Sequence, residues 1–526
     1  MHKVIFGWLT VVSLALLFLA FFWAPLYWFL LLLVPAWLIA IFDASQEDHA
    51  LRRNYPLLGR ARWLAEELRP FVRQYFLESE TEGAPIERMF RSVVYQRAKD
   101  EVDTIPYGTK LNVYADGYEW LGHSLGAINV EETSKNPRVL VGGDACRHKY
   151  SASVLNISAM SYGALSSAAI TALNRGAKAG GFYHNTGEGG LSPFHLQGGD
   201  VVWQIGTGYF GCRTPDGRFD DELFREKAAS PSVRMIEIKL SQGAKPGHGG
   251  ILPASKNTPE IAAIRVVPVG TDVISPSTHP EFNSPIELLQ FVQRLRDLCD
   301  AKPVGFKLCI GRRSEFLGIC KAMLETGILP DFITVDGGEG GTGAAPLEYS
   351  NSVGMPLREA LAFVDDALTG FGVRAQIRII ASGKIFTSFH MAKNFALGAD
   401  ICNSARGMML ALGCVQSLVC HTNRCPTGVA TQDPALVRGL SVPDKAERVA
   451  RFHHNSIHAL SDLMSSAGLT GPGDLNRSHI FRRVDQHAVL RYDQIFPPVE
   501  PGAFVKAPYP AAYAELLETS SATSFH

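Results

Sequence analysis

The chain of 526 residues has no excess of charge of either sign, because 50 lysines and arginines balance 51 aspartates and glutamates. Charge alone therefore favours neither nucleic acid nor an anionic surface as a partner. Cysteine is also scarce, with nine residues. A chain of this length can bury one large barrel or about two to four ordinary domains without disulfide staples. Any specificity must come from a particular site.

Charged residues are absent from Val4 to Phe42. As one helix this run would be about 58 Å long, nearly twice the bilayer core of roughly 30 Å. Two membrane spans are therefore predicted, with a break at Ala24 and Pro25. Proline ends a helix readily, and the aromatic residues around this break are typical of a headgroup interface. The sequence predicts a transmembrane helical hairpin.

Basic residues flank the apolar run: Lys3 precedes it, and Arg52, Arg53, Arg60 and Arg62 follow it. The positive-inside rule then places both ends of the hairpin in the cytoplasm. We expect the rest of the chain on the cytoplasmic side of the inner membrane, where cysteines stay reduced. A cleaved signal peptide is the alternative, although its apolar core normally spans only about 7 to 15 residues.

The predicted organisation has four parts. Residues 1–44 form the hairpin, 45–150 a connecting subdomain, 151–465 a barrel domain and 466–526 a C-terminal extension. The connecting subdomain begins charged and helix-prone and then becomes irregular. From residue 154 onward, short apolar runs alternate with longer helical stretches, which is the pattern of successive β and α units.

Eight of these apolar runs are predicted to be strands. They are "VLNIS" (154–158), "FYHNTG" (182–187), "VVWQIG" (201–206), "IEIKL" (236–240), "GFKL" (305–308), "FITVDG" (332–337), "RIIASG" (378–383) and "ICNSA" (401–405). Eight buried strands with crossovers predict a closed (β/α)8 TIM barrel of the α/β class, with its active site at the carboxyl ends of the strands. An open doubly wound sheet is the alternative. The turn after the first strand, "SAMSYGALS", lacks the G-x-G-x-x-G pattern of that fold.

Glycine is concentrated in two loops, "SQGAKPGHGG" after the fourth strand and "GGEGGTGAAP" after the sixth. Glycine lets backbone amides come close to a phosphate or a planar ring. In barrels the phosphate site typically follows strands seven and eight, which here lead into Ser382, Gly383, Ala405 and Arg406. The sequence therefore predicts a phosphate-bearing cofactor. Tight turns alone are the alternative explanation of the glycines.

Three of the nine cysteines, Cys414, Cys420 and Cys425, lie in the short stretch "GCVQSLVCHTNRCPTGVATQ" (413–432). Their spacing differs from the paired C-x-x-C of a zinc ribbon and from the C-x2-C-x2-C of a bacterial ferredoxin. Reduced thiols gathered in this way indicate a metal centre. The remaining cysteines are scattered and are interpreted as core residues.

Three motifs in order, "IEIKLSQGAKPGHGGILPASK", "DGGEGGTGAAP" and "CVQSLVCHTNRCPTGVATQ", resemble the FMN-binding synthase domain of glutamate synthases, from about Ser151 to Gln432. With the hairpin in front, the chain is similar to the membrane-anchored, stand-alone FMN-binding glutamate synthase family proteins of bacteria. The resemblance implies FMN and a [3Fe-4S] cluster held by Cys414, Cys420 and Cys425. A zinc site that adds His421, and a set of purely structural thiols, remain alternatives.

The resemblance also implies the flavin contacts. Lys307, at the end of the fifth strand, is expected beside flavin N1 and the C2 carbonyl, where a fixed ammonium stabilises the negative charge of the reduced ring. A salt bridge across the barrel opening is the plainer alternative for this lysine. The other expected contacts are Ala159, Met160, Ser161, Gln242, Gly340, Gly341, Thr342, Ser382, Gly383, Ala405 and Arg406.

For the substrate, the resemblance implies that Lys245, Arg265 and Ser284 bind 2-oxoglutarate. Buried carboxylates need such cationic or hydrogen-bonding partners. Lys245 and Glu188 are expected to join Lys307 in catalysis, with Glu188 as a proton carrier during imine formation. Glu188 could equally be a helix cap.

Two departures from the family pattern matter where that pattern reads "GEGGQLPG" and this chain has "GHGGILPA". His248 replaces an acid, and Ile251 replaces a glutamine that contacts the oxoacid. An aliphatic group in place of an amide weakens polar recognition by about 1 to 3 kcal/mol if nothing compensates.

The implied reaction is the reduction of 2-iminoglutarate, formed from 2-oxoglutarate and ammonia, to L-glutamate. We find no cysteine nucleophile for glutamine hydrolysis and no nicotinamide motif. Ammonia from solution or a partner and a separate electron-donor protein are therefore expected. One alternative keeps the cofactors but acts on a different oxo or imino acid, or passes electrons to a membrane partner. The other is a membrane-tethered scaffold without catalysis.

Overall fold

The eight predicted strands close into a parallel barrel in the computed structural model, which describes residues 2–525. They are β4 (Leu155–Ile157), β5 (His184–Asn185), β6 (Val201–Ile205), β7 (Val233–Lys239), β10 (Val304–Leu308), β11 (Phe332–Asp336), β12 (Arg378–Ser382) and β13 (Ile401–Ser404). Neighbours in the ring follow chain order, and β13 pairs with β4. Nearly every strand residue is buried, which explains the continuously apolar runs. The predicted barrel is confirmed, and the doubly wound sheet is wrong.

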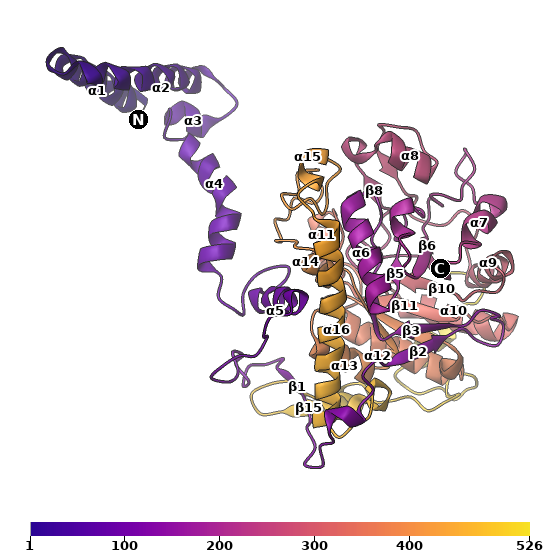
Figure 1. Cartoon of the computed structure of the whole chain (residues 1–526). Coiled ribbons are helices and arrows are strands. Elements are labelled where there is room, and N and C mark those ends of the chain that lie inside the picture. Colours follow the sequence, from indigo (N-terminus) through magenta and orange to yellow (C-terminus); the bar gives the residue numbers. More distant parts are fainter. Residues whose placement is uncertain (1, 526) are drawn as a thin grey trace. The chain divides into compact units, whose positions relative to one another are not determined.

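Helices form the outer layer of the barrel (Figure 1). They include α6 (Ser167–Gly180), α7 (Asp221–Ala228), α9 (Pro285–Leu298), α10 (Arg313–Thr326), α12 (Leu357–Gly370), α13 (Ser388–Ala396) and α14 (Arg406–Ala411). The connection from β5 to β6 carries only the short turn η4 (Pro193–His195). The long helix α16 (Val442–Ser466) packs against α6, α13 and α14 and thereby completes the layer.

A hairpin closes the amino-terminal end of the barrel. It consists of β2 (Arg138–Val141) and β3 (Tyr150–Ser153) in antiparallel pairing. Its inner residues share one buried cluster with side chains from the amino-terminal halves of the barrel strands: Val141, Tyr150, Ala152, Tyr183, Val202, Met235, Phe332, Ile380 and Ile401. At the opposite end, the strands finish and lead into loops. We call this carboxyl-terminal end the barrel mouth.

Long insertions follow strands β7 and β11 at the barrel mouth. The connection from β7 to β10 carries β8 (Ile251–Leu252), η5 (Ala254–Lys256), α8 (Pro259–Arg265) and β9 (Val273–Ile274) before α9. The connection from β11 to β12 carries α11 (Leu347–Ser352), and α15 (Pro434–Val437) follows the cysteine-rich stretch.

Segments before and after the barrel meet in a small antiparallel sheet of β1 (Glu119–Leu121), β14 (Ile480–Arg483) and β15 (Val489–Arg491). Glu119 attaches this sheet to the outer helices, because its carboxylate lies 3.0 Å from Arg358 of α12 and 2.6 Å from Lys393 of α13. The chain finishes with α17 (Tyr492–Ile495) and α18 (Ala514–Thr519).

Contacts divide the chain into two units, Met1–Arg88 and Met89–His526. The first unit contains α1 (His2–Phe22), η1 (Ala24–Leu26), α2 (Tyr27–Ser45), α3 (Ala50–Asn54), α4 (Arg60–Val72) and η2 (Arg73–Leu77); α5 (Arg88–Lys99) follows. Two stretches, α1 (His2–Phe22) and η1 together with α2 (Ala24–Ser45), are long and apolar enough to cross a membrane. The predicted break is confirmed, since η1 lies at Ala24 and Pro25.

Candidate active site

A fully satisfied carboxylate lies inside the barrel. Oε1 of Glu237 accepts hydrogen bonds from Asn185 at 2.8 Å and Gln204 at 2.7 Å, and Oε2 accepts one from Thr334 at 2.6 Å. All four side chains are buried. A hydrogen-bonded charge in such a dry setting acts strongly on its neighbours. The charge of Glu237 acts on Lys307 in the adjacent strand β10.

Lys307 extends from β10, and its Nζ lies 3.2 Å from Oδ2 of Asp336 at the end of β11. Burial alone would lower the pKa of Lys307, but the charges of Asp336 and Glu237 raise it above the ordinary value. The side chain is therefore an ammonium ion at neutral pH. The salt bridge considered for this lysine is present, and it holds a buried positive charge at the barrel mouth.

A second charged group lies beside the first. Nζ of Lys239, the residue that pairs in register with Lys307, is 2.7 Å from Oε1 of Glu188. Burial by itself would raise the pKa of Glu188, but the ammonium of Lys239, helped by Arg265 and Lys245, lowers it below the ordinary value. Glu188 is thus an ionised partner of a lysine and does not cap a helix.

Arg265, the last residue of α8, is 4% exposed. Its guanidinium donates to the carbonyl of Tyr162 at 3.2 Å and lies 5.2 Å over the Phe210 ring. Burial lowers the pKa of Arg265 to about 10. Its Nε has no hydrogen-bond partner among residues 2–525. A buried donor without a partner is costly, so this atom is available to a ligand.

Lys245, like Arg265, is a buried cation with a lowered pKa. Its Nζ donates to the carbonyl of Ala344 at 2.9 Å, and burial, with a further contribution from Lys239, lowers its pKa. Lys239, Lys245 and Arg265 together surround one carboxylate, that of Glu188. The group therefore carries a net positive charge at the barrel mouth. An anionic ligand would relieve this imbalance.

His279 supports the backbone of Lys239. Nε2 of His279 donates to the carbonyl of Lys239 at 2.8 Å, Nδ1 accepts from the hydroxyl of Tyr209 at 3.0 Å, and the ring stacks on Phe282. Burial lowers the pKa of His279 to about 4, so the ring is neutral. Ser284, the predicted substrate contact, caps α9, because its hydroxyl accepts the amide of Glu287 at 3.3 Å.

The loops after β7 and β11 touch across the mouth. The amide of Gly243 donates to Asp336 at 2.8 Å, and a Cβ at Gly243 would lie only 1.7 Å from the carbonyl oxygen of Gly337. Only glycine fits there. Gln242 lines a small cavity over the end of β7, together with Thr207, Lys239, Ser241, His248 and Gly250.

The predicted phosphate residues lie at or just after the ends of the neighbouring strands β12 and β13. The hydroxyl of Ser382 lies 3.3 Å from that of Ser158, and Gly383 follows with φ +142°. Arg406 donates to the carbonyl of Glu339 at 2.7 Å, and a Cβ at Gly341 would lie 2.7 Å from its Nε.

The other predicted flavin contacts lie in the loops around this group. Ala405 directly precedes α14, and the amide of Gly340 donates to the carbonyl of Gly337 at 2.8 Å. Thr342 is exposed. Next to the first strand, Ala159, Met160 and Ser161 form the loop after β4, and Gly187 with φ +64° lets the loop after β5 approach them, since a Cβ there would lie 2.9 Å from the amide of Ser161.

The cysteine-rich stretch 413–432, here called the cysteine loop, is fixed to two barrel loops. Nζ of Lys256 donates to the carbonyls of Cys420 at 2.8 Å, Ala430 at 3.0 Å and Ala164 at 3.3 Å. Gln432 donates to the carbonyls of Gly163 and Leu165. Lys256 belongs to the β7 insertion, so the cysteine loop lies against both that insertion and the loop after β4.

The three thiols differ in environment. Burial raises the pKa of Cys414 to about 12 and also raises that of Cys420. Burial would raise the pKa of Cys425 too, but hydrogen bonds from Thr427 and the backbone amides that follow it lower it. Within residues 2–525, no three His, Cys, Asp or Glu side chains form a single-ion site, including one with His421. A cluster places each thiolate on a different iron, so it does not require that geometry.

Several residues of this site were not predicted from the sequence. Lys239 and Asp336 pair with the predicted residues Glu188 and Lys307, and the charge of Glu237 acts on Lys307. His279 supports Lys239, and Lys256 holds the cysteine loop. One signal was available. Glu237 and Lys239 are two residues apart in the apolar strand "IEIKL", so their side chains point to the same face of β7.

Residues 119–470 match a family described as the conserved region in glutamate synthase. The chain belongs to the glutamate synthase family. The resemblance was based on the segment from about Ser151 to Gln432, and the match extends beyond both ends of that segment. Glutamate synthases are oxidoreductases, and the chain is an enzyme of this class.

Two relatives agree with this assignment. The glutamate synthase large subunit-like protein YerD of Bacillus subtilis is 37% identical over 499 residues, which cover 88% of this chain and 94% of that protein. An archaeal NADPH glutamate synthase of Methanocaldococcus jannaschii is 38% identical over 315 residues, covering 60% of this chain and 58% of that protein. Among solved structures, a mandelate oxidase with an FMN adduct is 15% identical with a TM-score of 0.38, over 77% of this chain and 96% of that one.

Proposed function

We propose that the protein reduces 2-iminoglutarate, formed from 2-oxoglutarate and ammonia, to L-glutamate, with FMN and a [3Fe-4S] cluster as its cofactors. The observation that carries this proposal is the pair of buried charged groups at the barrel mouth. Lys307 with Asp336 lies next to Lys239 with Glu188, and Lys245 and Arg265 add further positive charge. Lys307 with Asp336 suits an electron-rich ring, and the cations around Glu188 suit a dicarboxylate.

The substrate is held by the cations. Lys245 and Arg265 bind its carboxylates, and the free Nε of Arg265 provides one donor that has no other partner among the described residues. Imine formation joins ammonia to the oxoacid carbonyl with loss of water, and protons must move between nitrogen and oxygen. Glu188 is ionised and next to these cations. Its carboxylate takes up a proton from nitrogen and returns it to the departing hydroxyl.

The residues at the mouth fit FMN. Lys307 is a charged, buried donor at the end of β10, and Gly383, with φ +142°, adopts a backbone conformation that favours glycine. We assign Lys307 to the N1 and C2 carbonyl side of the ring. Ser382, Gly383, Ala405 and Arg406 would hold the phosphate, and Ala159, Met160, Ser161, Gln242, Gly340, Gly341 and Thr342 would line the remainder. When bound, FMN supplies the hydride for the imine carbon.

The cysteine loop fits an iron-sulfur cluster in its donor chemistry. Cys414, Cys420 and Cys425 provide three sulfurs, the amides after Cys425 donate toward one of them, and Lys256 contributes a buried positive charge. Hydrogen bonds and charge of this kind stabilise an anionic cluster. The cluster would pass electrons from a separate donor protein to the barrel mouth.

A second candidate function is favoured by two positions, Ile251 and His248. Ile251, in β8, is 47% exposed and offers no hydrogen bond, and His248 lies edge-on to Tyr349 in the neighbouring loop. This arrangement suits a less polar oxo or imino acid with the same cofactors.

We further propose that α1 and α2 anchor the protein in the inner membrane with both ends in the cytoplasm. The support is the apolar length of the two helices and the basic residues on both sides of them. Protease protection in right-side-out and inverted vesicles tests the orientation. Degradation of the barrel only in inverted vesicles is expected.

The catalytic proposal is tested with full-length protein purified anaerobically in detergent. Ammonia, a reduced low-potential donor and a panel of oxoacids are supplied, and amino-acid products are identified. Glutamate formed from 2-oxoglutarate is the expected result. Product from another oxoacid but none from 2-oxoglutarate would instead select the second candidate.

A further inference from the structure

Helix α4 and the turn η2 that continues it present an unpartnered apolar stripe. Leu64, Leu68, Phe71 and Tyr75 recur at helical spacing, and they are 57%, 49%, 51% and 53% exposed. This set is called the apolar stripe. Four arginines and two glutamates occupy other positions between 60 and 77. An amphipathic helix of this kind, basic on its polar side, is typical of a membrane interface.

The start of α4 is fixed to the end of α2. Asp43, fully buried in the last turns of α2, receives Nη2 and Nε of Arg60 at 2.7 Å and 2.9 Å and the amide of Leu57 at 3.1 Å. Arg60 is the first residue of α4. The amphipathic helix therefore begins where the second apolar helix ends.

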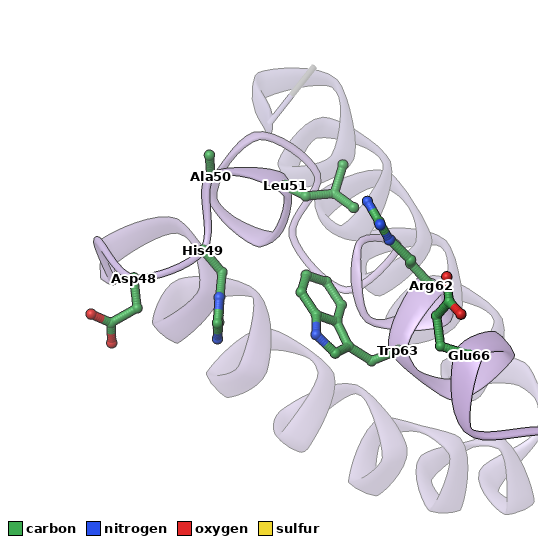
Figure 2. Close-up of a pocket in the computed structure, with 7 residues that line it drawn as sticks. All are labelled: Asp48, His49, Ala50, Leu51, Arg62, Trp63 and Glu66. Atoms are coloured by element: carbon green, nitrogen blue, oxygen red, sulfur yellow. The ribbon is translucent and has the colours of Figure 1, made fainter. Parts of the chain in front are cut away.

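Aromatic and basic side chains reinforce this corner. The guanidinium of Arg52 lies 4.3 Å over the Trp63 ring, and His49 packs against the same ring with centroids 5.3 Å apart. Figure 2 shows Trp63 between His49 on one side and Arg62 and Glu66 on the other. Within the first unit, α4 runs at a steep angle to α1 and α2 (Figure 1). This direction suits a helix that lies along the surface of a membrane crossed by α1 and α2.

We propose that the apolar stripe rests on the bilayer surface and that Arg62, Arg69 and Arg73 contact anionic headgroups. This inference rests on the proposed anchoring by α1 and α2. The ion pair between Asp43 and Arg60 places the stripe at interfacial depth. Arginine side chains beside an apolar face reach phosphate groups while their stems stay in the apolar region. The net positive charge of the segment opposes pairing with a second copy of itself.

The test separates α4 from the two spans. A protease site is inserted after Glu47 in the full-length protein, which is reconstituted in vesicles of phosphatidylglycerol and phosphatidylethanolamine and then cleaved completely. The part that carries α4 and the barrel is expected to stay with the vesicles. Leu68→Glu combined with Phe71→Glu should lower its bound-to-free ratio by about tenfold or more, because two apolar contacts become charged.

The matched control is Glu66→Gln with Glu67→Gln, outside the stripe, which should remain bound. Pure phosphatidylcholine vesicles should retain the cleaved wild type less well than anionic ones. Release of the cleaved wild type, or retention of the Leu68→Glu and Phe71→Glu variant at the wild-type level, would overturn the inference. Uncut wild-type protein that fails to enter vesicles would instead overturn the anchoring by α1 and α2, and this inference with it.

Discussion

The barrel mouth and the cysteine loop hold their reactive groups in different ways. At the mouth, Lys307 and Lys239 lie 3.2 Å and 2.7 Å from carboxylates on neighbouring strands or loops, so the charges are paired before any ligand binds. In the cysteine loop, Lys256 and Gln432 fix backbone carbonyls, while the thiols form no single-ion site within residues 2–525. Strands preorganise side chains, whereas a loop fixes the path of the chain and leaves the sulfurs to be placed by their ligand.

The largest expected effect comes from Cys425→Ala. Removing one of three thiolates should abolish cluster binding and activity with a protein electron donor, because no other sulfur of the loop can replace it. Iron and sulfide content measures the loss. Cys320→Ala, at a buried cysteine of α10, is the control and should keep the iron. Full iron content in the Cys425→Ala variant would refute the assignment of the loop.

Lys307→Met should lower the rate of oxoacid reduction by about 100- to 1000-fold, because the charge that stabilises the reduced ring is lost. It should also lower the flavin reduction potential, and Lys307→Arg should restore part of both. Lys302→Met, whose lysine contacts the carbonyls of Ala228 and Ser230, is the control. An unchanged flavin potential in Lys307→Met would show a purely structural salt bridge.

Glu188→Gln should destabilise the protein by about 3 kcal/mol at neutral pH, because it leaves buried cations without their carboxylate. The pKa of Glu188 is lowered, so its contribution is complete above the ordinary value of 4.5 and is lost as the pH falls through the lowered value. Thermal denaturation at several pH values measures the difference, which should shrink in acid. Glu222→Gln, at an exposed ion pair with Arg225, should stay within about 0.5 kcal/mol of wild type. A pH-independent difference would contradict the ion pair.

Lys256→Met should lower the reduction potential of the cluster by about 59 mV, a tenfold change in the one-electron equilibrium, because a buried positive charge is removed. Lys256→Arg should keep most of the potential. Redox titration followed by electron paramagnetic resonance measures it. Lys321→Met is a matched control, since this lysine also binds two backbone carbonyls, those of Leu517 and Ser520. Equal potentials in all variants would limit Lys256 to a structural role.

The smallest effect is expected for Ser284→Ala. The loss of the N-cap of α9 should cost about 1 kcal/mol of stability. The KM for the oxoacid should stay within about twofold of wild type, because the hydroxyl is engaged by the amide of Glu287. A larger rise in KM without a loss of stability would restore the substrate contact that the sequence predicts.

The fold could be predicted because each barrel strand is buried on both faces and leaves a short apolar run in the sequence. Lys307, Lys245 and Arg265 could be predicted from motifs, and the structure brings them to one mouth. Their carboxylate partners could not, because the pairing of Lys307 with Asp336 depends on strands that are neighbours only in the closed ring. The same limit applies to Lys256, whose three carbonyl partners come from two distant segments.

The most direct test is the composition of full-length protein purified without oxygen, measured by its visible spectrum, iron and sulfide content, and electron paramagnetic resonance. A flavin spectrum with one FMN and three irons per chain is the predicted result. Colourless, iron-free protein would contradict both the charged mouth as a flavin site and the cysteine loop as a cluster site.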